Sequence, residues 1–303
     1  MTGRFLFLSS LVAAMALGCS SAGAEMHTLY AASVRSAVSA DTPIAGNLYT
    51  VNLANGTATL VGAIRLPGAM SIGVTGLSAH PTSGVLYGIT SEKSPNNPHS
   101  LVKIDGASAT AELVGDLHVV GSDIAFDSKG TLYVWLPGTS QIGTVNLSDA
   151  VVTPIGKPGP AGTPAGLAID PNGMVYVISK GASGTLDNVD LATGALQIGP
   201  ALTGAPFSTQ INSMSFSPSG LLLAVNSNGG NPANTRLVTI NTATGVVATI
   251  GPLPDDTDAL AFSGTGPNIA PTLSTMSPGG RVVIAVVSTV LLVLAGMLVL
   301  RRK

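Results

Sequence analysis

The stretch GLAIDPNGMVYVIS, from Gly166 to Ser179, contains two short apolar runs on either side of a turn made of Pro, Asn and Gly. Similar stretches begin at four other positions: GLSAHPTSGVLYGIT at Gly76, DIAFDSKGTLYVWL at Asp123, SMSFSPSGLLLAVN at Ser213, and the fragment ALAFSGTG at Ala259. The intervals between consecutive copies are 47, 43, 47 and 46 residues. Repetition at this period predicts stacked or radially arranged structural units.

A second phrase recurs in step with the first, and it too is typical of a strand, a tight turn and a strand. Its five copies are VNLANGTATLVG (51–62), IDGASATAELVG (104–115), VNLSDAVVTPIG (145–156), VDLATGALQIG (189–199) and INTATGVVATIG (240–251). Together the two phrases supply four antiparallel strands per unit, which is the composition of one β-propeller blade.

The number of copies predicts how the ring closes. The fragment at Ala259 lacks a second strand, whereas HTLYAAS (27–33) is a second strand without a first. If these two segments pair, the ring closes and no terminal strand edge stays exposed. We therefore expect an all-β fold, a five-bladed β-propeller of four-stranded antiparallel blades over residues 27–266. The turn glycines Gly130, Gly173 and Gly220 are expected to adopt a positive φ.

The N-terminal segment has the pattern of an export signal. Arg4 precedes an apolar run, and the small residues Ala22-Gly23-Ala24 form an A-x-A cleavage site, which predicts a signal peptide over residues 1–24. The stretch Ala16 to Cys19 also resembles a bacterial lipoprotein box, so lipidation of Cys19 is the alternative.

The C-terminal segment has the pattern of a transmembrane helix. Residues 282–300 form an uncharged apolar stretch that is long enough to cross a bilayer as a helix. Three cations, Arg301, Arg302 and Lys303, directly follow this stretch, whereas a single one, Arg281, directly precedes it. The positive-inside rule places this basic tail in the cytoplasm and the rest of the chain outside. Residues 281–303 are thus expected to be a membrane helix with its tail, after a Pro/Gly/Ser/Thr-rich linker over 267–280.

Charge and cysteine content restrict the exported part further. It holds all 15 acidic residues but only eight of the 13 lysines and arginines, so it is net negative. This balance argues against a nucleic-acid partner, because phosphate binding needs an excess of cations. Cys19 is the only cysteine, so the mature domain has no intramolecular disulfide and depends on packing.

The repeat units resemble the bacterial propeller repeats of the NHL, YVTN and quinoprotein-dehydrogenase-like superfamily, through the strand, DPNG-type turn and LYV phrase. The resemblance covers most of the exported domain and implies the fold. Quinoprotein enzymes of this kind stack their cofactor on several tryptophans of an eight-bladed ring, whereas this chain has one tryptophan, Trp135.

The C-terminal region resembles the IPTL-CTERM sorting signal. Pro271, Thr272, Leu273 and Ser274 precede the apolar span and the basic pair Arg301 and Arg302. The resemblance implies that an exosortase-like membrane enzyme recognises the signal and removes it. It also implies delivery to the cell surface or its polysaccharide matrix. The alternative is a plain tail anchor that holds the propeller in the periplasm at the inner membrane.

The sequence offers weak candidates for catalysis. It contains no zinc-type Cys/His spacing, H-E-x-x-H, Walker loop or G-x-S-x-G elbow, so we expect no metal and no cofactor. Asp123 and Asp258 stand at the start of predicted innermost strands, next to the central channel. Hydrolysis of a sugar linkage uses two carboxyl groups, but these two belong to blades that are not adjacent.

Loop lengths point to a binding surface instead. The first-to-second and third-to-fourth turns of the blades share one face, here called the turn face, and they are short. The opposite face, here called the insertion face, carries the long insertions 33–47, 90–100 and 226–236, on blades one, two and five. Loops on a rigid scaffold often carry recognition residues. The candidates are Arg35, Asp41, Glu92, Lys93, Asn96, Asn97, His99, Asn228, Asn231, Asn234 and Arg236.

Three functions stay open at this point. The leading hypothesis is an exported binding or structural module of the cell envelope, without catalytic activity, that contacts a polysaccharide or protein. The alternative is a secreted hydrolase or lyase with its active site at the propeller axis. The third is a matrix component with no discrete ligand.

Overall fold

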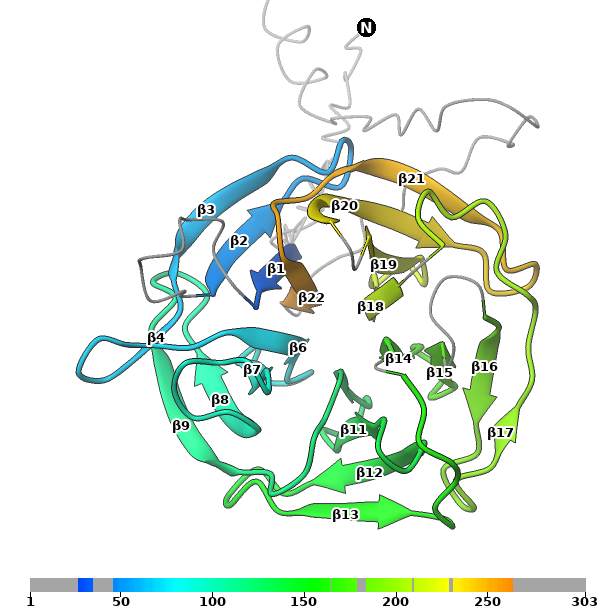
Figure 1. Ribbon diagram of the computed structural model, residues 1–303, viewed down its shortest axis with the longest axis horizontal. Coiled ribbons are helices and arrows are strands. Elements are labelled where there is room, and N and C mark those ends of the chain that lie inside the picture. The colour runs from blue at the N-terminus through cyan, green and yellow to red at the C-terminus, as the bar shows by residue number, and fades with distance from the viewer. Residues whose placement is uncertain are drawn as a thin grey trace, which may run out of the picture.

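Five four-stranded antiparallel sheets surround a common axis in the computed structural model, which describes residues 27–34, 46–163, 165–178, 184–208, 210–228 and 231–263 (Figure 1). Each sheet is one blade, and the innermost strands contact one another in the order β22, β6, β10, β14, β18 and back to β22. This confirms the predicted five-bladed β-propeller.

The strands follow the two sequence phrases. Blade one contains β1 (Thr28–Ser33), β2 (Asn47–Val51), β3 (Ala58–Ala63) and β22 (Thr257–Ser263). Blade two contains β6 (Val74–Ala79), β7 (Leu86–Thr90), β8 (Ser100–Ile104) and β9 (Ala111–Asp116). Blade three contains β10 (Ile124–Phe126), β11 (Leu132–Leu136), β12 (Gln141–Val145) and β13 (Val152–Ile155). Blade four contains β14 (Leu167–Ile169), β15 (Val175–Ile178), β16 (Leu186–Val189) and β17 (Leu196–Gln197). Blade five contains β18 (Gln210–Phe216), β19 (Leu222–Asn228), β20 (Asn231–Ile240) and β21 (Val247–Pro252).

The ring closes as the copy number predicts. The last described strand, β22, pairs antiparallel with the first, β1, so that Ala31 lies opposite Leu260 and Tyr30 opposite Ala261. Blade one is therefore built from both ends of the described chain. Its pairing covers the strand edges that an open ring would leave exposed.

The core consists of five apolar layers, one between each pair of neighbouring blades. Leu77 and Ile104 of blade two, for example, pack with Leu48 and Ala259 of blade one. Each blade alone would leave both faces of its sheet in water, so the stability comes from stacking the blades around the axis. This arrangement explains how the described residues, which include no cysteine, hold their shape.

The turn glycines behave as expected. Gly130, Gly173 and Gly220 have φ values of 85°, 87° and 80°. A residue with a Cβ rarely adopts this conformation, so the DPNG-type turns depend on the glycine that ends them.

Two features of the insertion face differ from the sequence analysis. The insertion 226–236 was predicted as a loop, and that is wrong for most of it, because β19 and β20 continue as a long hairpin through Asn228 and from Asn231. Pairing between β19 and β20 continues there, from Asn226 opposite Arg236 to Asn228 opposite Asn231. The Asn-rich composition did not reveal this pairing. An unforeseen small hairpin, β4 (Arg65–Leu66) and β5 (Met70–Ser71), joins blades one and two.

The predicted terminal segments lie outside the described residues. They comprise the signal peptide 1–24 with Cys19, the linker with Pro271, Thr272, Leu273 and Ser274, and the segment 281–303 with Arg301 and Arg302. Among the described residues, no helix is long and apolar enough to cross a bilayer.

Candidate functional site at the propeller axis

Three β-bulges lie at the insertion end of the axis. The pairing register shifts around Thr75 in β6, Asn212 in β18 and Asp258 in β22, so each of these residues is the extra one opposite its partner strand. A bulge turns a side chain away from the direction that the pleat would give it, and bulges are frequent next to functional sites. The three bulged strands belong to blades two, five and one, which are neighbours.

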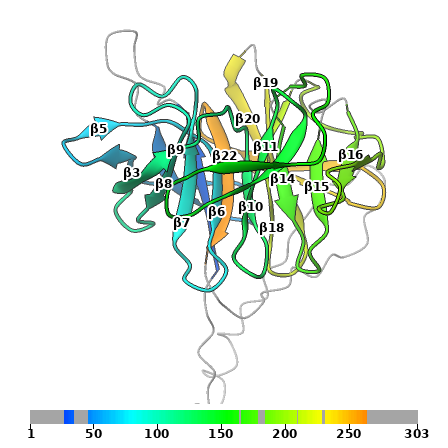
Figure 2. The same cartoon turned by 90° about the horizontal axis from the view of Figure 1, so that it is seen from below.

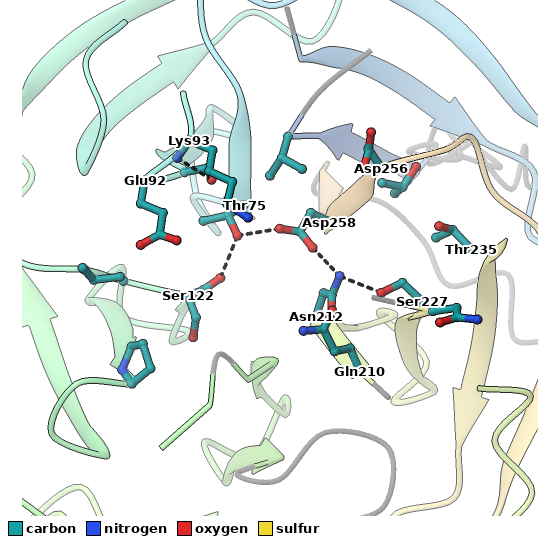
Figure 3. A pocket seen from close by; sticks show the side chains of 17 residues that line it. Thr75, Glu92, Lys93, Ser122, Gln210, Asn212, Ser227, Thr235, Asp256 and Asp258 are labelled. Atoms are coloured by element: carbon teal, nitrogen blue, oxygen red, sulfur yellow. Dashed lines mark hydrogen bonds between the residues drawn. The ribbon is translucent and has the colours of Figure 1, made fainter. Parts of the chain in front are cut away.

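The bulged side chains meet in one hydrogen-bonded row. Thr75 Oγ1 donates to Asp258 Oδ2 at 2.7 Å, and Asn212 Nδ2 donates to Asp258 Oδ1 and, at 3.1 Å, to Ser227 Oγ. The Thr75 hydroxyl also lies 3.5 Å from the carbonyl oxygen of Ser122. Figure 3 shows this row across the floor of a pocket, with Asp258 at its centre.

The pocket has a volume of about 300 Å³ and opens on the insertion face. Its walls come from the ends of the strands and from the loops above them. Besides the row on the floor, its polar lining includes Glu92, Lys93, Gln210, Asn228, Thr235 and Asp256. Figure 3 shows the Glu92 carboxylate directed into the same space. The lining thus combines amides, hydroxyls and three carboxylates with one lysine.

Asp258 is a pocket carboxylate whose ionisation is altered by its surroundings. Burial raises its pKa from 3.8 to about 6, opposed by the hydrogen bonds from Thr75 and Asn212. The nearby charge of Asp256 raises the pKa further, and that of Lys93 lowers it. Asp258 therefore changes charge close to neutral pH, and it does so in contact with the pocket.

Asp123 has a different role, although the sequence placed it in the same class. Its side chain is completely buried. It accepts hydrogen bonds from the backbone N–H of Leu167 (2.9 Å) and Met214 (3.0 Å), and from the hydroxyl of Ser213 (3.1 Å). These donors belong to blades four and five, so the carboxylate of blade three links three blades across the axis.

Asp123 is also outside the pocket lining, and no ligand in the pocket can reach it. Burial raises the pKa of Asp123 well above its ordinary value, against the backbone hydrogen bonds from Leu167 and Met214. Of the two candidate catalytic aspartates, the structure leaves only Asp258 in contact with the pocket.

The candidate recognition residues of blade two divide into two groups. Glu92 and Lys93 line the pocket. Asn96 instead donates through Nδ2 to the carbonyl oxygen of Ser71 at 2.8 Å, which ties its loop to the β4–β5 hairpin. Asn97 and His99 have positive φ values of 43° and 56° and shape the turn of that loop.

The remaining candidates come from blades five and one. Asn228, at the end of β19, lines the pocket. Asn231, Asn234 and Arg236 lie in β20, where Arg236 pairs with Asn226 on one side and Pro252 on the other. Arg35 and Asp41 lie outside the described residues.

Sequence reasoning missed most of the pocket floor. Thr75, Ser122 and Asn212 stand directly before the first residue of a repeat copy, and Asp258 holds the same place in its own copy. A comparison of that one position across the copies would have given Thr, Ser, Ala, Asn and Asp. That mainly polar set at the axis was the available signal.

Among the described residues, no three or more His, Cys, Asp or Glu side chains are grouped closely enough to hold a metal ion. The pocket lining is instead suited to forming many neutral and charged hydrogen bonds with an organic ligand.

The comparisons with known proteins concern the fold. No protein-family model matches the chain, and no curated protein matches its sequence. A chain from the crystal structure of the nidogen/laminin complex is similar at 13% identity and a TM-score of 0.49, over 78% of this chain and 98% of that one. A gluconolactonase from Xanthomonas campestris matches at 13% identity and a TM-score of 0.43, over 70% and 74%. TolB from Acinetobacter baumannii matches at 14% identity and a TM-score of 0.44, over 75% and 53%.

Proposed function

We propose that this protein is an exported binding module of the cell envelope and that its axial pocket holds a hydroxyl-rich ligand, such as a sugar unit of a polysaccharide. The observation that carries the proposal is the convergence of three bulges, at Thr75, Asn212 and Asp258, on the floor of one pocket. Bulges that merely bent the strands would have no reason to bring three polar side chains together.

The chemistry of the lining supports this class of ligand. A sugar hydroxyl both donates and accepts a hydrogen bond. The pocket offers carboxylate acceptors in Asp258 and Glu92, and amide groups in Gln210 and Asn212 that can do both. A volume of about 300 Å³ lies at the lower end of the range for small-molecule sites.

The envelope context is supported by the sequence at the two ends. The export pattern of residues 1–24 and the apolar segment 282–300 predict delivery across a membrane, with anchoring or sorting afterwards. The Pro-Thr-Leu-Ser motif at 271–274 favours an exosortase-like processing enzyme as a partner. In that setting an accessible ligand is a polysaccharide of the surface or matrix.

The test compares two matched double variants for binding to an oligosaccharide array and to envelope polysaccharide. Thr75→Val with Asn212→Leu removes two polar groups from the pocket floor. Thr82→Val with Asn172→Leu makes the same changes on exposed turns of the opposite face. Loss of two hydrogen bonds at about 1 kcal/mol each predicts more than about tenfold weaker binding for the pocket variant alone. Equal retention of both folded variants would refute the proposal.

A hydrolase is the second candidate, and one observation favours it. Asp258, with a pKa of about 6, is partly protonated near neutral pH, and Glu92 shares its pocket. An acid and a base flanking a sugar linkage are what glycoside hydrolysis requires. This candidate predicts release of reducing sugar that disappears in both Asp258→Asn and Glu92→Gln. Release that persists in Asp258→Asn would reject it.

A further inference from the structure

Both ends of the described chain lie on the turn face. β22 begins at Thr257, which with Asp258 lines the axial pocket, and it ends at Ser263 beyond Phe262, which lines a separate hollow at the other end of the axis. β1 runs in the opposite direction, and Thr28 lies opposite Ser263. In Figure 2 the arrow of β22 accordingly points away from the side where the β19–β20 hairpin and β5 lie.

The reason is the way blade one is built. In the other blades a short turn joins the first strand to the second on the turn face, for example Asp127 to Gly130 between β10 and β11. In blade one these strands are β22 and β1, so the two chain ends take the place of that turn. Any anchor at either end must therefore leave the propeller on the turn face.

The segments that connect the propeller to its predicted anchors are short, so they do not easily let the opposite face turn toward the membrane. Residues 264–281 separate Ser263 from the predicted span at 282–300. A flexible linker of this length has a root-mean-square end-to-end distance of about 25 Å, which is about the length of one seven-residue strand. The alternative anchor, a lipid on Cys19, stands only eight residues before His27.

The charge on the turn face opposes direct contact with an anionic bilayer. Its turns carry five aspartates, Asp105, Asp127, Asp149, Asp170 and Asp190, against one lysine, Lys129. Each carboxylate accepts a hydrogen bond from the backbone N–H two residues further on. Hydrogen bonds, first of all those from the backbone of Ala107 and Ala192, lower the pKa of Asp105 and Asp190, so both remain ionised. Anionic lipids attract basic segments and repel such a face.

We infer that the turn face of the propeller points toward the membrane to which the chain is anchored, but does not bind to the bilayer. The axial pocket then opens away from the bilayer. The inference rests on the proposed export and on retention of one anchor, either the C-terminal apolar segment or a lipid on Cys19, but not on the pocket being a binding site. It holds for either anchor, because both leave the same face. The ligand must then be presented from the side away from the membrane, as on a polymer that extends over the anchoring surface.

The orientation can be measured with single cysteines in the full chain. Cys19 is the only native cysteine and is removed or lipidated in either maturation route, so an introduced thiol is labelled alone. Asn172→Cys places a donor fluorophore on the turn face, and Glu92→Cys places one at the pocket mouth; both positions are exposed. Energy transfer to acceptors on lipid headgroups in isolated membranes then reports the height of each site.

The expected result is clearly stronger transfer from position 172 than from position 92, equivalent to a height difference of about 20 Å, the length of one strand. Raising the salt concentration should increase transfer from position 172 as the repulsion is screened. Equal transfer from both positions, or stronger transfer from position 92, would overturn the inference. A chain that alkaline washing removes from the membrane would overturn the anchoring as well. Polysaccharide binding by the wild-type chain is a separate measurement, and neither orientation result decides it.

Discussion

Two consecutive levels of the axis contain equivalent residues of the five blades and differ in what these residues do. The floor level, Thr75, Ser122, Ala165, Asn212 and Asp258, is mostly polar, and its bulged members face the pocket. The interior level, one residue further along, is Gly76, Asp123, Gly166, Ser213 and Ala259. It contains one carboxylate among small residues, and that carboxylate bonds to backbone groups.

The two carboxylates near the propeller axis differ in their donors. Asp123 receives backbone N–H groups that cannot move, so its loss would leave buried donors unpaired. Asp258 receives side chains, those of Thr75 and Asn212, which can turn toward water or a ligand. All five residues of the interior level are buried, and this level lies between the pocket and the separate hollow at the other end of the axis.

The largest effect is expected from Asp123→Ala. Unpairing the buried N–H groups of Leu167 and Met214, at about 1–3 kcal/mol each, should lower the free energy of unfolding by about 2–6 kcal/mol. Asp258→Ala should cost only about 1 kcal/mol, since its donors face the pocket. Urea unfolding of both variants measures the difference. Similar losses for the two would mean that the levels do not differ in role.

Gly76→Ala tests how tightly the interior level is packed. A Cβ at Gly76 would lie 2.8 Å from Cα of Asp123 and 3.0 Å from the backbone nitrogen of Ile124. Such overpacking against backbone should cost about 1–3 kcal/mol. Gly138→Ala is the matched control, because nothing lies within 4 Å of a Cβ there. Thermal melting that shows no difference between the two variants would contradict the packing described for this level.

Asp258 should make stability depend on pH in a defined direction. Its pKa is about 6 in the folded protein and 3.8 as the ordinary value, so between these values the folded state binds more protons than the unfolded state. Protonated Asp258 contributes to the free energy of unfolding at pH 4. About 2 kcal/mol of this contribution is lost as the pH rises to about 6.

Asp258→Asn should lack this loss. The difference between wild type and variant isolates it, because other acids, Asp123 included, contribute to both curves. Unfolding curves at several pH values between 4 and 7 provide the measurement. Parallel stability profiles for the two proteins would show that Asp258 keeps an ordinary pKa.

Thr75→Val should give the smallest effect. It removes a hydrogen bond that lowers the pKa of Asp258, so the titration midpoint of this carboxyl should move upward, with a stability change of about 1 kcal/mol or less. Carbon-13 NMR of the aspartate carboxyl groups follows the midpoint directly. An unchanged or lower midpoint would place the Thr75 hydroxyl elsewhere in solution.

The sequence was sufficient for the ring and for its closure, because both depend on counting local patterns. The LYV and turn phrases specify strand pairs. The fragments at His27 and Ala259 each lack a partner strand in their own part of the sequence, so each is expected to pair with the other. Turn glycines such as Gly173 were predictable because only a positive φ fits that place in the turn.

The pocket floor was not predictable in the same way. A bulge is defined by a mismatch between two strands, so Thr75, Asn212 and Asp258 cannot be recognised from one strand alone. The burial of Asp123 depends on donors from blades four and five, which lie far away in the sequence. The insertion 226–236 was predicted as a loop because Asn and Gly dominate it, whereas pairing between β19 and β20 extends both strands.

The central claim is that the floor level binds a ligand while the interior level only holds the fold. Titration calorimetry with polysaccharide from the producing cell's envelope tests it through Asp258→Asn against Asp127→Asn, an equal change on the turn face. The account predicts at least about tenfold weaker binding for Asp258→Asn, equivalent to about 1.4 kcal/mol, and unchanged binding for Asp127→Asn. Wild-type affinity in a folded Asp258→Asn variant would contradict it.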